Sequence, residues 1–284
     1  MITLGTTTLP LAGWIANPQQ PVESRAHRLR AIRQIVEGYG LQAAELTLDL
    51  QAIYSHVFDA GFYESVAELQ RELGFVCTVH LPFLWVEPAS LNETIRRASV
   101  DCLRQAVEST RAVDVHAYVL HLWGFTMGQV ISQLREPVQR QALLGVLLAQ
   151  ASRSLSALCE IVEPADLCIE NLEDSLFDLA LPIIEQHRVS ICLDVGHLAL
   201  QGGDATDFMA KHGDRIREIH LHDAIVPQHG ENPARDHLAL GQGLIDYAAF
   251  LAKLDEVDYQ GPIILEVNSK ADLEQSLAAL KAIP

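Results

Sequence analysis

The sequence predicts a (β/α)8 barrel with an active site at the carboxyl ends of its strands. Three observations support this prediction: eight short apolar runs, helical segments between most of them, and strands that are apolar throughout rather than alternating. Continuously apolar strands are expected in a parallel sheet that is buried on both faces. Eight such units is the number that closes a barrel. We therefore expect residues 1–284 to form one domain.

The predicted strands are β-rich apolar runs, each four to seven residues long or slightly shorter at the start of the chain. They lie at residues 2–4, 44–48, 75–81, 117–122, 166–171, 189–195, 216–221 and 262–267. The alternative is a doubly wound open sheet. Its phosphate-binding glycine fingerprint is absent after the first strand, which disfavours it.

The predicted helices have apolar residues at helical spacing and separate the strands. They lie at residues 24–37, 91–111, 137–161, 176–186, 248–254 and 270–282. No linker rich in Gly, Pro or Ser interrupts this alternation, so nothing in the sequence divides the chain into two domains.

Composition limits the partners. The chain carries 37 Asp and Glu against 20 Lys and Arg, a net charge of −17. Binding to nucleic acid and to anionic membranes depends on Lys and Arg, so we expect a small-molecule substrate, no nucleic acid and no membrane. One basic cluster, Arg25, Arg28, Arg30 and Arg33, is interpreted as a solvated helix face.

The five cysteines are odd in number and form no CxxC pair. The amino-terminal apolar stretch lacks the positive charge of a signal peptide. Both features predict reduced thiols in a cytoplasmic protein. Cys168 and Cys192 lie two residues before acids on their strands and are expected to fill the barrel interior. A homodimer formed through outer helices is compatible with a closed barrel.

Metal-ligating side chains fall at the ends of six predicted strands. They are His80, His121, Glu170, Asp194, His220 and Glu266. One such residue alone is more often a core histidine or a helix cap, but a parallel barrel brings all six to one rim. The three carboxylates would not all ionise there without cations. The mixed imidazole and carboxylate set suits Zn²⁺, Mn²⁺, Fe²⁺ or Co²⁺, so the sequence predicts a divalent metal site.

These segments resemble the xylose isomerase-like barrel superfamily of TIM barrels, which includes endonuclease IV and many sugar isomerases and epimerases. The resemblance spans about residues 80–266 and rests on six segments in family order. They are residues 80–82 (HLP), 170–171 (EN), 194–197 (DVGH), 219–223 (IHLHD), 241–243 (GQG) and 265–266 (LE). Each segment alone is weak evidence, but six in order, one per strand end, are specific.

The resemblance implies one of two kinds of site. In the sugar enzymes, residues matching Glu170, Asp194, His220 and Glu266 hold one metal, and the two Glu, 170 and 266, serve as acid and base. In the endonuclease IV kind, up to three metals are held. The matching ligands here are His80, His121, Glu170, Asp194, His197, His220, His237 and Glu266. This sequence has all eight, and His237 stands where the sugar enzymes tend to have Arg.

Carried over by position, the resemblance divides these ligands among the ions. The first ion would take His80, His121 and Glu170, and the second would take Glu170, Asp194, His220 and Glu266. His197 and His237 would hold a third ion or contact a phosphate. The acid expected two residues before His237 is Arg235 here, which removes the third metal or shifts its ligand to Asp236. We therefore expect one to three metals per chain.

The sequence leaves three functions open. The first is a metal-dependent hydrolase of a small phosphodiester. The second is a metal-dependent sugar isomerase or epimerase using Glu170 and Glu266 as acid and base. The third is a barrel that binds a metal or ligand without catalysis.

Aromatic residues in segments near the predicted active face indicate either loop packing or a broad, flat ligand. They are Trp14, Phe83, Trp85, Trp123 and Phe125. Together with His222 and Arg235, the three Trp are the predicted substrate-binding residues; His222 is expected behind the metal ligands or facing substrate. Within the superfamily, a cobamide-remodelling phosphodiesterase, which cleaves a cobamide nucleotide loop, would fit such a site.

Overall fold

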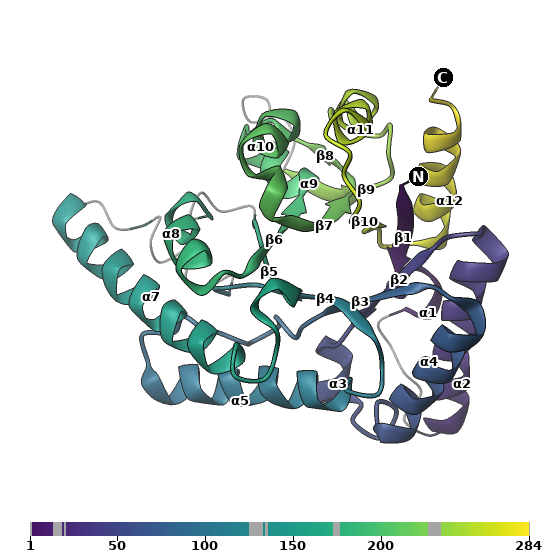
Figure 1. Cartoon of the computed structure of the whole chain (residues 1–284), viewed down its shortest axis with the longest axis horizontal. Helices are drawn as coiled ribbons and strands as arrows, with labels where there is room; N and C mark the ends of the chain where they lie inside the picture. The colour runs from purple at the N-terminus through teal and green to yellow at the C-terminus, as the bar shows by residue number, and fades with distance from the viewer. Residues whose placement is uncertain are drawn as a thin grey trace.

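The computed structural model describes residues 2–13, 19, 21–124, 133, 136–172, 177–226 and 234–283, with only the backbone of 21–23. Eight parallel strands form a closed barrel in the order β1-β10-β7-β6-β5-β4-β3-β2, with helices around its outside (Figure 1). The barrel closes where β1 pairs with β2, with Thr7 opposite Glu45. The predicted (β/α)8 TIM barrel is confirmed.

All eight predicted strands are present, each within a few residues of its expected position. The barrel strands are β1 (Thr3–Thr7), β2 (Ala43–Thr47), β3 (Val76–His80), β4 (Val115–Leu120), β5 (Leu167–Glu170), β6 (Ser190–Asp194), β7 (Ile216–Leu221) and β10 (Pro262–Leu265). The first strand extends beyond the predicted apolar run. Its threonines are polar but β-branched, and such side chains fit a strand well.

Helices follow most strands. They are α1 (Leu9–Ala12), α2 (Pro21–Arg33), α3 (Asp49–Ile53), α4 (Ala60–Leu73), α5 (Glu93–Ser109), α7 (Pro137–Leu158), α8 (Phe177–His187), α9 (Val195–Leu200), α10 (Ala205–His212), α11 (Tyr247–Glu256) and α12 (Lys270–Lys281). A five-residue π-helix, η1 (Gln34–Gly38), directly follows α2, and two short 3₁₀ helices are η2 (Pro164–Asp166) and η3 (Gly213–Arg215). Helix α4, between β2 and β3, is not among the predicted helices. Asp59 caps its first turn, and Gly74 ends it in the left-handed conformation, which glycine adopts readily.

A short antiparallel hairpin lies beyond the end of β7 and was not predicted. It pairs β8 (Asp223–Ile225) with β9 (Arg235–Leu238). The Asp223 carboxylate is fully buried and accepts backbone hydrogen bonds from Ala224, Gly241, Gly243 and Ile245. The acid at 223 and the glycines at 241 and 243 therefore hold this hairpin and the following turn together.

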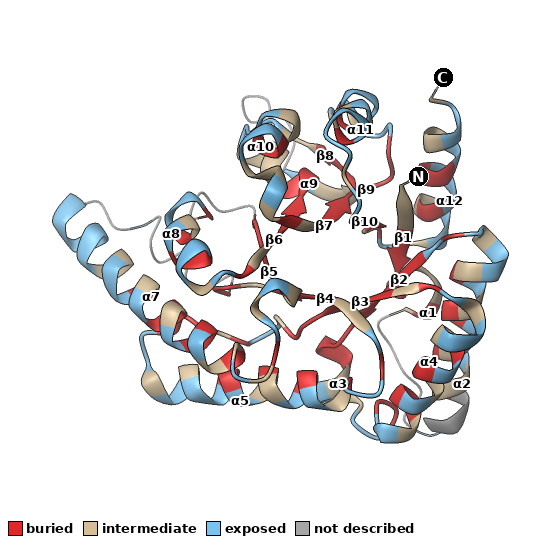
Figure 2. Cartoon of the chain, viewed as in Figure 1, coloured by how far each residue is buried: buried red, intermediate tan, exposed pale blue. Residues whose placement is uncertain are grey.

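The core lies between the strands and the helices, and Figure 2 shows the strands buried and the outer helix faces exposed. A second, smaller cluster fills the barrel interior with Ala117, Val119, Cys168 and Cys192, as predicted for the two cysteines. Among the described residues, none of the helices has the length and apolar character needed to cross a membrane.

The predicted basic cluster on the first long helix makes contacts within the chain. Arg25 pairs with Asp59 at 2.6 Å, and Arg33 pairs with Glu72 at 2.8 Å. Arg28 is buried, and its guanidinium lies 4.9 Å from the ring centre of Phe58. Arg28 therefore differs from the predicted solvated face, because its side chain packs against an aromatic ring.

Candidate metal centre

The six predicted strand-end residues converge on one end of the barrel. His80, Glu170 and Asp194 are the last residues of β3, β5 and β6. His121 and Glu266 directly follow β4 and β10, while His220 lies within β7. A parallel barrel has this effect because the carboxyl ends of all its strands form one rim.

The first group of possible ligands is His80, His121 and Glu170, whose ligand atoms lie within 4.8 Å of one another. Glu170 Oε2 is 3.2 Å from His80 Nε2 and 2.9 Å from His121 Nε2. His80 Nδ1 lies 2.9 Å from the backbone oxygen of Leu81, a contact that orients the ring. These are the three residues that the resemblance assigns to the first ion.

The second group is Glu170, Asp194, His220 and Glu266, also within 4.8 Å of one another. His220 Nδ1 lies 3.1 Å from Glu170 Oε1, 3.0 Å from Glu266 Oε2 and 4.0 Å from Asp194 Oδ2. The two oxygens of Glu170 therefore face different groups, Oε2 toward His80 and His121 and Oε1 toward His220.

The backbone around Asp194 is fixed by its neighbour on β5. The Asn171 side chain donates to the Asp194 carbonyl at 2.8 Å and accepts from the Asp194 N–H at 2.9 Å. Asp194 Oδ1 in turn accepts from the His197 N–H at the start of α9. The residue pair 170–171 and the segment 194–197 are thus joined by hydrogen bonds, which hold Glu170 and Asp194 next to each other at the rim.

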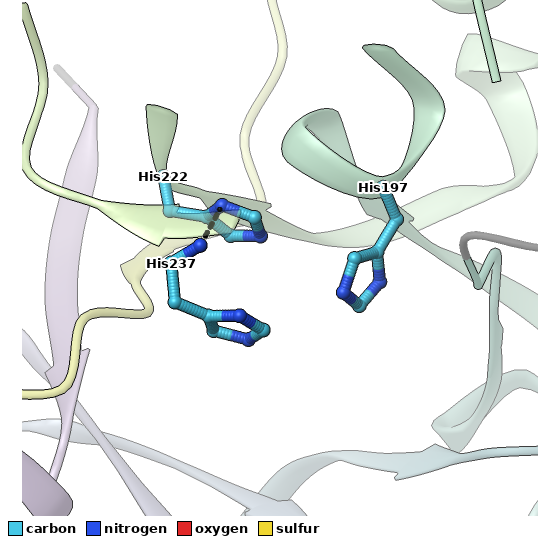
Figure 3. Close-up of side chains that lie close together, drawn as sticks. All are labelled: His197, His222 and His237. Atoms are coloured by element: carbon cyan, nitrogen blue, oxygen red, sulfur yellow. Dashed lines mark hydrogen bonds between the residues drawn. The ribbon is translucent and has the colours of Figure 1, made fainter. Parts of the chain in front are cut away.

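A third group consists of His197, His222 and His237 (Figure 3). His197 comes from α9 and His237 from β9, and His222 lies between β7 and β8. The rings of His222 and His237 stack with centroids 4.4 Å apart, and His197 faces both rings nearly at right angles. The His237 N–H donates to His222 Nδ1 at 2.9 Å.

His222 makes a second contact that bears on its role. Its Nε2 lies 3.1 Å from Asp194 Oδ2, and the residue is fully buried. Because Nδ1 accepts from a backbone N–H, the proton of the neutral ring is on Nε2, which donates to Asp194. In this arrangement His222 donates to a predicted ligand, which is the contact that a residue behind the metal ligands would make.

Asp236 lies at the edge of the third group. Its Oδ1 is 3.2 Å from His237 Nδ1, and its Oδ2 is 3.8 Å from His197 Nε2. Arg235 is exposed and begins the strand. The acid that the resemblance places two residues before His237 therefore has a counterpart next to His237.

Buried charge of both signs shapes the pKa values of the site. Burial raises the pKa of Glu170, but the charges of His220 and His121 outweigh it and hold that pKa well below its ordinary range. Burial lowers the pKa of His80, but Glu170 outweighs it and raises the pKa to about 10. Burial also lowers the pKa of His237, but the interactions of its ring with Asp236 and Glu266 outweigh this effect and raise the pKa to about 11. Protonated imidazoles thus balance the carboxylates.

The donor set fits divalent cations. Glu266 Oε2 is buried and makes no hydrogen bond to the described residues, although His220 Nδ1 lies 3.0 Å from it. A buried carboxylate oxygen without a hydrogen bond is costly, and a cation bound beside it would remove that cost. Imidazole nitrogens with carboxylate oxygens are ligands that Zn²⁺, Mn²⁺, Fe²⁺ and Co²⁺ share.

Sequence reasoning missed two acids beneath the site. Glu45 on β2 and Glu218 on β7 are fully buried, and with His220 they form a fourth group within 4.8 Å. Glu45 Oε2 lies 3.2 Å from His220 Nε2, whereas Glu218 Oε1 is 4.0 Å from the same nitrogen. The available signal was a charged residue within a continuously apolar strand.

The aromatic residues predicted near the active face divide into four cases. Trp14, like the neighbouring candidate Phe125, lies outside the described residues. Trp85 is 87% exposed, with a φ of 59° in the segment after β3. Trp123 is only 3% exposed and packs in the core, which does not support its predicted contact with substrate. Phe83 stacks on His121 with ring centroids 4.7 Å apart and so borders the first group.

Comparison with known proteins agrees with the fold. A sequence profile described as xylose isomerase-like TIM barrel matches residues 32–283. An uncharacterised protein of Methanocaldococcus jannaschii is 28% identical over 272 residues, covering 83% of this chain and 84% of that protein.

Solved structures with the same architecture include the following two. A D-tagatose 3-epimerase-like protein has a TM-score of 0.74, 23% identity, and coverage of 99% and 96% of the two chains. An AP endonuclease, family 2, from Brucella melitensis has a TM-score of 0.67, 15% identity, and coverage of 99% and 98%.

Proposed function

Because the chain belongs to the xylose isomerase-like TIM barrel family, we propose that it is a metal-dependent hydrolase of a small phosphodiester. Members of this family include epimerases and AP endonucleases, so the family alone leaves the reaction open. The choice rests on the geometry of the ligand groups.

The observation that carries the proposal is the division of Glu170 between two groups. Its Oε2 faces His80 and His121, and its Oε1 faces His220. A carboxylate in this position suits a bridge between two cations. Two cations about 3.5–4 Å apart clamp a phosphodiester, activate a water and stabilise the leaving oxygen. An isomerase with one metal has no evident need for His80 and His121 to converge on Glu170.

The remaining histidines suit the proposed substrate. His197 Nδ1 lies 3.6 Å from Asp194 Oδ2 and His237 Nε2 lies 3.7 Å from Glu266 Oε1, so both histidines border the second group. The high pKa of His237 keeps its ring protonated at neutral pH in the absence of a cation. A protonated imidazole would donate to a phosphate oxygen, or the same nitrogens would ligate a third cation together with Asp236. Either role uses the predicted residues at 197 and 237.

Elemental analysis and a single variant test the proposal. We expect two or three metals per chain and turnover of bis-p-nitrophenyl phosphate by the loaded protein. His121→Ala should lose about one metal and most of this turnover. His56→Ala, which removes an exposed histidine outside the four ligand groups, is the control and should retain both. A loaded protein with one metal and no phosphodiester turnover would contradict the proposal.

A sugar isomerase or epimerase is the second candidate. The observation that favours it is the group of Glu170, Asp194, His220 and Glu266, which holds two Glu around one possible metal. The structural likeness to a D-tagatose 3-epimerase-like protein is compatible with it. This candidate predicts that His121→Ala keeps one tightly bound metal and full turnover of a ketose, an outcome opposite to that of the hydrolase.

We further propose that the substrate is small rather than a nucleic acid. The net charge of −17 and the internal ion pairs of Arg25 and Arg33 argue against a long phosphate track. The exposed ring of Trp85 suits a broad ligand, and a cobamide nucleotide loop is the candidate substrate. If so, Trp85→Ala should raise KM for the cobamide but not for bis-p-nitrophenyl phosphate. Cleavage of abasic DNA in preference to both would overturn this assignment.

A further inference from the structure

We propose that Glu45 is a positioning residue for the metal centre: its carboxylate accepts a hydrogen bond from His220 Nε2 and so directs the lone pair of Nδ1 toward Glu170 and Glu266. The inference rests on the metal centre of the proposed function, but it does not depend on which reaction that centre performs.

The geometry places Glu45 and the ligand group at opposite nitrogens of one ring. Glu45 Oε2 lies 3.2 Å from Nε2, while Glu170 Oε1 and Glu266 Oε2 lie 3.1 and 3.0 Å from Nδ1. A neutral imidazole carries one N–H, so the nitrogen that donates leaves the other as the ligand. An acceptor at Nε2 therefore selects Nδ1 for the cation.

Glu45 depends on this contact as much as His220 does. Both residues are fully buried, and Glu45 Oε1 has no hydrogen-bond partner among the described residues. In the strand register Glu45 lies between Thr7 and Thr78, whose side-chain oxygens make no hydrogen bond in the described structure. A buried carboxylate requires donors, and His220 is the group that supplies one.

Glu218 provides a matched comparison within the same layer. It is also fully buried, and its Oε1 is 4.0 Å from His220 Nε2, beyond hydrogen-bonding distance. Neither of its side-chain oxygens makes a hydrogen bond among the described residues. Glu45 and Glu218 thus differ in the one feature that the inference requires.

The test compares metal affinity in three variants. Glu45→Leu removes the acceptor at similar volume and should weaken Co²⁺ binding 10–100-fold, the usual effect of losing a partner that orients a ligand. Glu45→Gln retains an oxygen that accepts from Nε2, so it should restore most of the affinity. Glu218→Gln should bind Co²⁺ within a few-fold of the unmodified protein.

Two measurements besides activity decide the outcome. Competition with a chelator gives the Co²⁺ affinity, and ¹⁵N NMR of the zinc-loaded protein locates the ring proton of His220, which we expect on Nε2. Unchanged affinity in Glu45→Leu, or a proton on Nδ1, would overturn the inference. If Glu45→Leu does not fold, Glu45→Gln and the NMR measurement still decide. Metal binding without phosphodiester turnover would refute the proposed function alone.

Discussion

Gly196 lies directly against the imidazole of His222, so that a Cβ on Gly196 would overlap the ring. The same ring donates to Asp194 and accepts from the His237 N–H. The glycine between Asp194 and His197 thus leaves room for a side chain that holds a proposed ligand. This relationship explains the small residue in the segment 194–197.

Gly196→Ala should therefore displace His222 and loosen Asp194. Overpacking of this kind costs about 1–3 kcal/mol of unfolding free energy, and we expect metal content to fall with it. Denaturant unfolding and elemental analysis measure the two effects. Gly145→Ala is the control, because Gly145 is exposed in α7 and a Cβ added there would meet open space. That variant should gain up to about 1 kcal/mol. Equal behaviour of the two variants would argue against the steric account.

Asp223→Asn should destabilise the protein without touching a proposed ligand. Four backbone N–H groups donate hydrogen bonds to the Asp223 carboxylate. In the Asn variant an NH₂ group replaces one of the two acceptor oxygens, so some of these donors lose their acceptor. Unsatisfied buried donors predict a loss of roughly 2–4 kcal/mol in urea unfolding. Asp101→Asn, at an exposed position in α5, should change stability by less than about 0.5 kcal/mol. A loss no larger at 223 than at 101 would refute the assigned role.

Metal loading should release protons. The pKa values of His80 and His237, about 10 and about 11, keep both rings protonated near pH 7.5 in the metal-free protein. Cations compete with these protons, so affinity should rise with pH until about pH 11, and ligation by both histidines should release at least two protons per chain. Calorimetry in two buffers of different ionisation enthalpy measures the release. His237→Gln should reduce it by about one proton, and loading without release would contradict the prediction.

Whereas metal affinity should rise with pH, the folding stability of the metal-free protein should fall as the pH rises. The raised pKa values mean that the folded state holds these protons more tightly than the unfolded chain does. The stability that the protonated His80 and His237 contribute is fully present below their unfolded pKa near 6.5, and it is lost as the pH rises through about 10 and 11. Bound metal should abolish this alkaline loss, which thermal unfolding with and without Zn²⁺ would detect.

His116, outside the metal centre, should destabilise the protein in mild acid. Burial, aided by the charge of Arg217, lowers the pKa of His116, and its buried Nε2 has no hydrogen-bond partner in the described part of the chain. The unfolded chain therefore binds a proton more readily, and stability falls as the pH drops from its unfolded pKa near 6.5 toward its lower folded value. His116→Gln should flatten this part of the pH–stability curve. His56→Gln, at an exposed position, serves as the control, and a slope unchanged by His116→Gln would contradict the prediction.

Much of the fold was predictable because it depends on local pattern. Apolar runs such as 189–195 and 216–221 can be recognised as strands from a few adjacent residues. The order of the strands along the chain then determines which strands are neighbours in a parallel barrel. The ligand groups followed from the same logic, since a residue at a strand end can only reach the common rim. The β8–β9 hairpin escaped prediction because its strands are short, and because the Asp223 side chain in β8 accepts hydrogen bonds from the backbone N–H groups of Gly241 and Gly243, which are distant in the sequence.

The sequence by itself determined the barrel, the rim and the chemical types of the groups that meet there. Tertiary structure decided which oxygen of Glu170 faces which histidine, that His222 supports Asp194, and that Glu45 lies beneath His220. These relationships depend on strand register and side-chain rotamers across residues as far apart as 45 and 220. A pattern of neighbouring residues carries no record of such distances, whereas the closed barrel sets them by bringing every strand into hydrogen-bonded register.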